Sequence, residues 1–202
     1  MVYESPNGDR ELDSPKMSHS DDNLIVSQVI EGQKDLFRLL IRQYERAVYG
    51  MGRSFFRNSD DASDFVQEVF IKAYRSLSQF EGRSRFSTWL YKIAYNTAIN
   101  ELTRRKEYRS LLEEDTNKLS GGSDTPERAL LREAAREAVQ NALKELPERY
   151  RICIDLFFFY DRSYQEIEAI TGFPVNTIKS HVFRAKKMLR EKLKQDKFEE
   201  FE

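Results

Sequence analysis

The sequence predicts an all-α protein made of two small helical domains that a flexible linker joins. Along most of the chain, apolar residues recur at spacings of three and four, which is the period of an amphipathic helix. A polar stretch that contains Gly121 and Gly122 interrupts this pattern near the middle, and Pro126 ends it. Because such a stretch resists helix formation and has few apolar side chains for a core, we expect a separately packed unit on each side of it.

Composition sets the domain boundaries. The leader contains Pro6, Gly8 and Pro15 but few large apolar residues, as disordered segments do, and the linker begins with the acidic run Glu113–Asp115. We therefore expect a disordered leader at residues 1–20, a first domain at 21–108, a flexible acidic linker at 109–125, a second domain at 126–195 and an acidic tail at 196–202.

The charges are segregated, although the net charge of the 202 residues is only −1. Both ends of the chain are mainly acidic, whereas basic clusters lie at Arg104–Lys106 and Lys179–Lys194. Local patches rather than the net charge attract nucleic acid, so the composition leaves DNA binding open.

Several classes of protein are disfavoured. The single cysteine, Cys153, excludes an intrachain disulfide and a multi-cysteine zinc site, and its place in the apolar run Ile152–Tyr160 predicts a core residue. His19 and His181 are the two histidines and no glycine-rich phosphate loop is present, so we expect no enzyme, no metal and no cofactor. No stretch has the length and apolarity of a membrane span, and the start lacks the apolar core of a signal peptide. We expect a soluble, cytoplasmic protein.

Three helices are predicted in the first part of the chain: residues 21–30, a longer helix after Gly32 that ends near Phe55, and, after a polar break at Asn58–Ser63, a helix at Asp64–Leu77. The third helix has a clear apolar stripe, formed by Val66, Val69, Phe70, Ala73 and Leu77. Its opposite face mixes charged groups and an amide with an aliphatic group: Asp64, Gln67, Glu68, Ile71 and Arg75. A solvated face and a protein-binding site explain this composition equally well.

A loop at Phe80–Arg85 leads into a long helix at about Phe86–Lys106. Away from its apolar side runs a second stripe, formed by Trp89, Lys92, Asn96, Asn100 and Thr103. An indole can stack on unpaired bases, amides can bind base edges and a cation can bind phosphate. Ser87 and Thr88 could add phosphate contacts, and the basic cluster Arg104–Lys106 extends the stripe. Trp89 alone would equally suit a lid over the core, but the whole stripe favours nucleic acid.

The second domain is expected to contain helices at Glu127–Leu143 and from Leu146 to about Tyr160, followed by a helix-turn-helix at Ser163–Lys187. Ser163 and Glu166 have the spacing of a capping box, and Gly172 with Pro174 ends the short first helix.

The second helix of this motif has a buried stripe at Ile178, Val182, Ala185 and Leu189, and an opposite side with Asn176, Lys179, Ser180, Phe183, Lys187 and Arg190. In a helix-turn-helix, such a helix enters the major groove of DNA. A lysine-rich solvated face is the alternative. Phe183, an aromatic residue in the middle of that face, favours DNA, because a ring can contact a thymine methyl group or a sugar.

Two segments together resemble the bacterial RNA polymerase sigma factors of the extracytoplasmic-function (ECF) group. The family's second conserved region is similar to DFVQEVFIKAYRSLSQFEGRSRFSTWLYKIAYNTAINELTRR, at Asp64–Arg105. Its fourth region is similar to LPERYRICIDLFFFYDRSYQEIEAITGFPVNTIKSHVFRAKKML, at Leu146–Leu189. Both motifs in this order, with a flexible linker between them, make the resemblance specific.

The resemblance implies a protein that binds the β and β′ subunits of core RNA polymerase, directs it to −35 and −10 promoter DNA and starts strand opening. It implies core-binding roles for Asp64, Gln67, Glu68 and Ile71. It implies −10 recognition, with capture of a flipped base in the loop, for Phe80, Arg83, Arg85, Phe86, Trp89, Lys92, Asn96, Asn100 and Arg104. It implies −35 recognition for Asn176, Thr177, Lys179, Ser180, Phe183, Arg184 and Lys187. An anti-sigma factor is a further implied partner.

Two positions depart from the pattern of that family. Asn176 stands where glycine is usual, and His181 stands where arginine is common, which weakens the positive charge near the DNA backbone. The alternative function is a stand-alone helix-turn-helix regulator, which would need a dimer interface or an effector domain in the first half of the chain. The Trp89–Thr103 stripe occupies that half instead.

Overall fold

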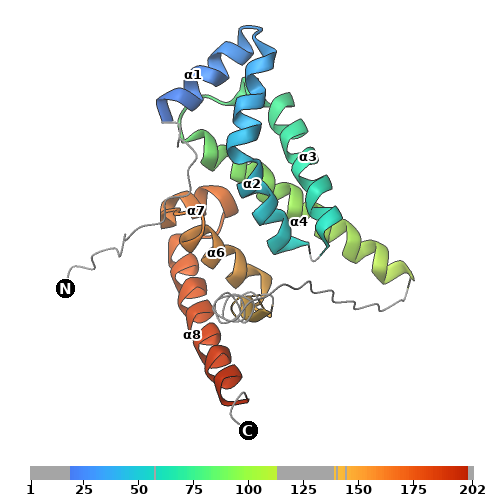
Figure 1. Cartoon of the computed structure of the whole chain (residues 1–202), viewed down its shortest axis with the longest axis vertical. Coiled ribbons are helices and arrows are strands. Elements are labelled where there is room, and N and C mark those ends of the chain that lie inside the picture. The colour runs from blue at the N-terminus through green and yellow to red at the C-terminus, as the bar shows by residue number, and fades with distance from the viewer. Residues whose placement is uncertain (1–18, 57, 113–138, 140, 144, 200–202) are drawn as a thin grey trace, which may run out of the picture.

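The structure, a computed structural model, describes residues 19–56, 58–112, 139, 141–143 and 145–199 (Figure 1). These residues form helices and short turns without a β-strand, which confirms the all-α prediction. The helices are α1 (His19–Ile30), α2 (Phe37–Phe55), α3 (Ser59–Arg75), α4 (Phe86–Leu112), α6 (Glu148–Phe158), α7 (Tyr164–Thr171) and α8 (Val175–Glu199), with 3₁₀ turns η1 (Lys34–Leu36) and η2 (Leu77–Gln79).

Helix α3 begins earlier than predicted. The predicted break after α2 is present but short: Ser59–Ser63 already belong to α3, because the Asn58 side chain accepts a hydrogen bond of 2.8 Å from the backbone N–H of Asp60 and caps the helix. Asp60 and Asp61 in the first turn also suit the positive end of the helix dipole.

Other helix boundaries also differ from the prediction. Helix α4 continues to Leu112, six residues beyond the predicted Lys106, and α6 ends at Phe158, before the predicted Tyr160. The predicted helix at Glu127–Leu143, the leader and most of the linker lie largely outside the described residues.

The predicted apolar stripes form the core of the first four helices. Val69 and Ala73 of α3 are fully buried, as are Leu40 and Val48 of α2, and Leu90 of α4. Burying a side chain of this size stabilises a fold by about 1.5–3 kcal/mol. The α3 face that carries Asp64, Gln67, Glu68 and Ile71 is consequently turned away from the core.

The helix-turn-helix has the predicted local structure. Ser163 accepts from the backbone N–H of Glu166, whose carboxylate accepts from the Ser163 N–H at 3.0 Å, so both halves of the capping box form. Gly172 ends α7 in the left-handed region with φ 76°. Ile178, Val182 and Ala185 of α8 are buried, and so is Cys153 of α6, whose thiol pKa burial raises to about 12.

The two predicted domains pack against each other. Helix α7 lies against α4, and α6 touches α2, so one apolar core runs from α1 through α8 (Figure 1). The Tyr160 hydroxyl donates to the carbonyl of Ala47 at 3.0 Å, and its ring meets that of Tyr91 with centroids 5.4 Å apart. No local pattern in the sequence predicts this contact.

Two features are absent from the described residues. None of their helices combines the length and apolarity needed to cross a membrane. Among these same residues, no three His, Cys, Asp or Glu side chains are grouped so that they could hold a metal ion.

Candidate nucleic-acid interface

The outer face of α3 presents acids beside an exposed aliphatic side chain. Asp64, Gln67 and Glu68 are exposed, and Ile71 has half of its surface in solvent. Glu68 forms a salt bridge of 2.7 Å with Lys72 one turn later, where both side chains are largely solvated. An isolated surface pair of this kind adds little stability, so this face is available to a partner.

The polar stripe of α4 is exposed as predicted. Lys92, Asn96, Asn100 and Thr103 all face solvent along one side of the helix, and they have the spacing of successive turns. The buried residues Leu90, Ala94 and Ala98 anchor the opposite side. The helix therefore presents two amides and a cation to solvent without disturbing the core.

Trp89 combines both roles considered for it. It is half-buried, and its ring packs against Phe80 and Phe86 with centroids 5.4 Å and 5.7 Å away. Phe86 is only 1% exposed and also packs against Tyr44, so in this conformation it cannot contact DNA, contrary to its predicted role. Phe86 instead packs against Phe80 and Trp89 from the core side. Part of the Trp89 and Phe80 surfaces stays accessible to solvent.

The loop before α4 is basic and turns at Gly82, whose φ of 69° favours glycine. Arg83 is almost fully exposed and pairs with Glu81 at 2.6 Å. Arg85 is half-exposed, and its Nε lies 4.0 Å from a carboxylate oxygen of Glu166 in α7. Both guanidinium groups remain within reach of a nucleic-acid ligand.

The basic cluster that follows the stripe divides into two roles. Arg104 is exposed and pairs only locally with Glu101 at 2.6 Å. Arg105, by contrast, binds both carboxylate oxygens of Asp61 at 2.7 Å and 3.0 Å and lies over the ring of Phe56. These hydrogen bonds lower the pKa of Asp61 and raise that of Arg105. Arg105 therefore ties α4 to α3 and does not extend the stripe.

The predicted recognition face of α8 is solvated. Phe183 is 69% exposed, Asn176, Lys179, Arg184 and Lys187 are exposed, and Thr177 and Ser180 are half-buried. Arg184 also donates to the Tyr150 hydroxyl at 3.1 Å, which orients its side chain.

An aromatic row beside this face was not predicted. The rings of Phe157 and Tyr164 stack at 4.9 Å and 11°, the Lys179 ammonium lies 5.8 Å from the Tyr164 ring, and that of Lys186 lies 4.6 Å from the Phe158 ring. Cations above ring faces are attracted by the ring quadrupole. The row holds two lysines along one flank of α8, and the run Phe157-Phe158-Phe159 was the available signal.

His181 is a packing residue. Its ring lies between Tyr150 and Phe173, with centroids 5.0 Å and 5.5 Å away, and close to the Cys153 thiol. Burial, with the nearby Arg149 and Arg184, lowers the pKa of His181. The ring is therefore neutral near pH 7, which agrees with the expected loss of positive charge at this position.

Comparison with known proteins identifies the family. The model of Sigma-70 region 2 matches residues 40–108, and that of Sigma-70, region 4, matches residues 136–189. The RNA polymerase sigma-H factor of Pseudomonas aeruginosa is 36% identical over 181 residues, which are 86% of this chain and 94% of that protein. The ECF RNA polymerase sigma-E factor of Escherichia coli K12 is 38% identical over 180 residues, 85% of this chain and 94% of that protein.

The chain belongs to the ECF sigma factors. Solved structures agree with this assignment. The sigma factor RpoE of Bartonella quintana, in complex with the anti-sigma factor NepR, superposes with a TM-score of 0.65 at 25% identity over 78% of this chain and 96% of that one. CnrH, in complex with the cytosolic domain of CnrY, gives 0.63 at 26% identity over 87% and 98%.

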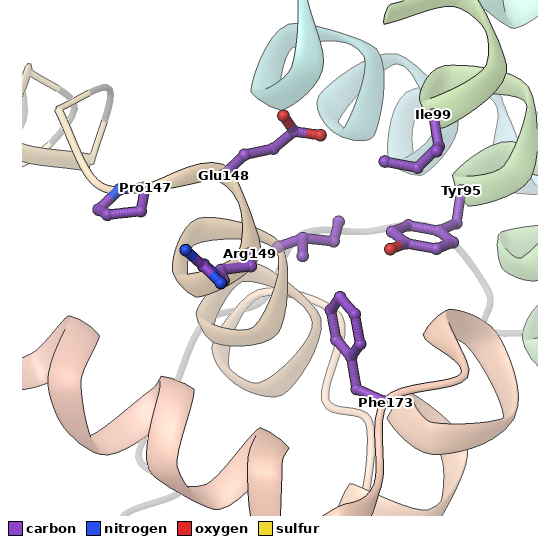
Figure 2. Close-up of a pocket in the computed structure, with 7 residues that line it drawn as sticks. Tyr95, Ile99, Pro147, Glu148, Arg149 and Phe173 are labelled. Carbon is purple, nitrogen blue, oxygen red and sulfur yellow. The ribbon is translucent and has the colours of Figure 1, made fainter. Parts of the chain in front are cut away.

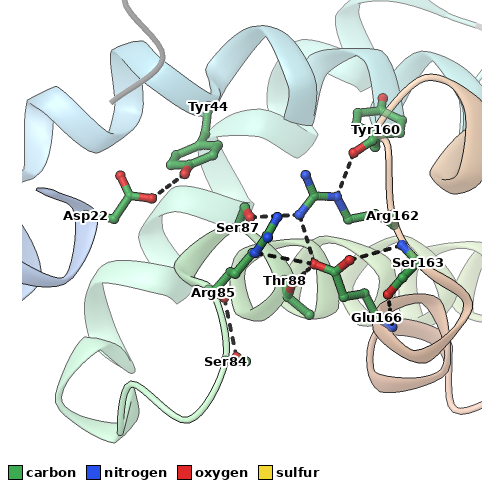
Figure 3. Close-up of polar contacts among 10 residues, drawn as sticks. All are labelled: Asp22, Tyr44, Ser84, Arg85, Ser87, Thr88, Tyr160, Arg162, Ser163 and Glu166. Atoms are coloured by element: carbon green, nitrogen blue, oxygen red, sulfur yellow. Dashed lines mark hydrogen bonds and ion pairs between the residues drawn. The ribbon is translucent and has the colours of Figure 1, made fainter. Parts of the chain in front are cut away.

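The predicted site residues of this sigma factor fall into its two regions. The acid–aliphatic face of α3 and the stripe of α4 lie within the region 2 match, and the recognition face of α8 lies within the region 4 match. Ser87 and Thr88 lie where the two regions meet, and each is only 4% exposed. They contact Arg162 and Glu166 instead of solvent (Figure 3). They are thus not free to bind phosphate in this arrangement. The one sequence signal for this contact was the i,i+4 spacing of Arg162 and Glu166.

Proposed function

We propose that this ECF sigma factor, which binds core RNA polymerase and directs it to promoters for transcription initiation, divides its work among three solvated surfaces. These are the face of α3 for core polymerase, the stripe of α4 with the preceding loop for the −10 element, and the recognition face of α8 for the −35 element. The observation that carries the proposal is that region 2 exposes two faces of different chemistry, one acidic and aliphatic, the other amide-rich and cationic.

The α3 face suits a helical partner with basic and apolar side chains. Asp64 and Glu68 lie one turn apart and supply the charge, Gln67 supplies hydrogen bonds, and Ile71 supplies an apolar anchor at the end of the row. This composition fits docking onto a subunit of core polymerase.

The α4 stripe suits an unpaired strand. Trp89 offers a ring for stacking, Asn96 and Asn100 offer donors and acceptors for base edges, and Lys92 offers a charge for phosphate. Phe80, Arg83 and Arg85 border the place where an extruded base would enter. Extrusion costs a few kcal/mol, and stacking with edge hydrogen bonds would offset that cost.

The α8 face suits duplex DNA. Lys179, Arg184 and Lys187 supply positive charge around Phe183, while Asn176, Thr177 and Ser180 supply short polar groups near the start of the helix. In helix-turn-helix proteins, the first residues of the second helix contact base edges.

Two further features belong to the proposal. Bartonella quintana RpoE and CnrH are described in complex with an anti-sigma factor and with the cytosolic domain of CnrY, respectively, and an anti-sigma factor is a fitting regulator of this chain. Because this sigma factor acts on promoter DNA, we place it in the cytoplasm. Its role is the regulation of transcription and not catalysis.

The proposal is tested with purified core polymerase and a promoter selected by transcript sequencing. The double variant Asp64→Ala/Glu68→Ala should lose core binding, and with it all run-off transcription. Glu31→Ala/Asp35→Ala removes two exposed acids outside α3 and serves as the charge-matched control. A stand-alone regulator, in contrast, would bind duplex promoter DNA tightly by itself and yield no transcript with core enzyme.

A further inference from the structure

We propose that regions 2 and 4 of the free sigma factor form a closed arrangement without the help of another protein. A polar latch joins them, in which Arg162 and Glu166 contact Ser87 and Thr88 of α4. This closed form must open before both promoter elements can be bound. The inference rests on the proposed function of the α4 and α8 surfaces. It adds an interaction surface on region 4 whose partner is region 2 of the same chain.

Arg162, just before α7, is the first centre of the latch. Its guanidinium donates to the Ser87 hydroxyl at 3.1 Å, to a Glu166 carboxylate oxygen at 3.2 Å and to the carbonyl of Tyr160 at 2.6 Å (Figure 3). The same group lies 5.7 Å from the centre of the Tyr91 ring of α4. The Arg162 side chain is only 13% exposed, so nearly all of its donors face protein.

Glu166 is the second centre. Its carboxylate accepts from the Thr88 hydroxyl at 3.2 Å and lies 4.0 Å from Arg85, while it also completes the capping box of α7. Partial burial opposes ionisation, but the bonds from Ser163 and Thr88 and the charge of Arg162 outweigh it and lower the pKa of Glu166. One carboxylate thus starts the helix and holds the other domain.

A less polar contact surrounds these two centres. Tyr160 donates to the carbonyl of Ala47 and packs edge-on against Tyr91. Phe173 packs edge-on against Tyr95, and the Ser54 hydroxyl donates to the carboxylate of Asp155, which is 7% exposed. Helices α2 and α4 of region 2 therefore both contribute to the closed interface.

The closed form cannot read both elements at once. Helices in contact have axes about 8–10 Å apart, and α7 packs on α4 and on α8. The −35 and −10 elements lie roughly 25 base pairs apart, which is about 85 Å at 3.4 Å for each base pair. Because α8 moves with α7, region 4 must leave α4 before the −35 element can be bound together with the −10 element.

The interface between the two regions has features of a transient contact. A solvent-open pocket of about 350 Å³ lies between the domains, lined by Tyr95, Ile99, Pro147, Glu148, Arg149, Ile152 and Phe173 (Figure 2). Water can therefore enter at the edge of the interface, and polar interfaces between domains resemble transient rather than permanent contacts. Binding of core polymerase can therefore replace the latch.

Interdomain distance in the free, full-length protein tests the proposal. Glu45 of α2 and Arg190 of α8 are exposed, so Glu45→Cys and Arg190→Cys provide two spin-label sites, while the native Cys153 is fully buried. Wild-type protein should show one short, narrow distance distribution. Glu166→Gln keeps the cap acceptor but loses the charge, and should raise the open fraction about tenfold. Glu168→Gln, on the same helix and exposed, is the matched control and should change nothing.

A kinetic measurement supports the distance measurement. If opening precedes binding, the association rate of Glu166→Gln with core polymerase should exceed that of wild type by up to tenfold, with equal run-off transcription at saturation. Tyr160→Phe removes one latch bond without touching the α7 cap and should act in the same direction, so a misfolded Glu166 variant would not end the test. A broad wild-type distribution that neither variant changes would overturn the latch, whereas loss of transcription with wild-type protein would refute the proposed function instead.

Discussion

At the scale of single residues, exposure separates side chains that hold the fold from those that can bind. Phe183 and Phe86 are both aromatic residues in predicted DNA-binding segments, yet one is 69% exposed and the other 1%. Helical periodicity placed Phe183 correctly, because the face of a residue within a helix is a local property. The burial of Phe86 depends on Tyr44, which is far away in the sequence, so periodicity could not reveal it.

Phe183→Ala should weaken −35 recognition without weakening the fold. The exposed ring contributes little to the core, while a lost base-pair contact costs about 1–3 kcal/mol, which is roughly a 5- to 150-fold loss of transcription from a promoter that depends on its −35 element. Thermal denaturation and run-off assays measure both quantities. Unchanged selectivity between matched and altered −35 elements would show that the ring does not contact DNA.

Asn96→Ala should impair promoter opening and leave core binding intact. Asn96 is exposed in the middle of the α4 stripe, and loss of a base-edge partner is expected to reduce opening by about 1–3 kcal/mol. Permanganate reactivity of −10 thymines reports opening, and co-purification reports core binding. Asn23→Ala, on α1, is the matched control; a loss of core binding by Asn96→Ala would assign the stripe to the polymerase.

At the scale of elements, the same residue types can end a helix or begin one. Asn58–Ser63 was interpreted as a break because Asn, Asp and Ser are common in turns, but Asn58 caps α3. For α7, the glutamate three residues after Ser163 removed this ambiguity, and the capping box was predicted correctly. A cap can therefore be identified from sequence when its reciprocal partner is present.

Gly172→Ala should destabilise region 4 by about 1 kcal/mol. The cost comes from the backbone, since φ is 76° and an added Cβ would meet no atom within 4 Å. Gly172→Asn should cost less, because asparagine tolerates the left-handed region. Urea denaturation of the three proteins gives the ranking, and an alanine variant as stable as wild type would contradict it.

At the scale of the whole molecule, sequence reasoning found both domains and missed their contact. The bonds that join them connect residues 75 to 113 positions apart, and no local pattern marks such pairs. The run Ile152–Tyr160 was interpreted as an apolar core segment, which left Asp155 within it out of account. A carboxyl group is seldom buried without a partner, so this one residue was the available hint of a second surface over α6.

Stability of the closed form should depend on the protonation of Asp155. Burial raises its pKa from 3.8 to about 6, although the Ser54 hydroxyl and the charge of Arg151 oppose the change. A raised pKa in the folded state means that folding favours the protonated form of Asp155. Its contribution to the free energy of unfolding is therefore present at low pH and is lost as the pH rises through 6. The resulting gain in unfolding free energy at pH 5 over pH 8 is about 1.4 kcal/mol.

Asp155→Asn isolates this contribution, because the amide stays neutral and can still bond the Ser54 hydroxyl. The difference in unfolding free energy between wild type and variant should therefore change by about 1.4 kcal/mol from pH 5 to pH 8. Asp61, Glu101 and Glu166 have lowered pKa values and stay ionised throughout that range in both proteins. Their contributions therefore cancel in the difference between wild type and variant. Tyr160, which also faces Asp155, keeps its proton, since its pKa is raised as well. Parallel pH profiles for the two proteins would contradict this prediction, because they would show that Asp155 is ionised in the closed form. If Asp155 is protonated there, the narrow interdomain distance of the wild-type protein should be more stable at about pH 5 than at about pH 8.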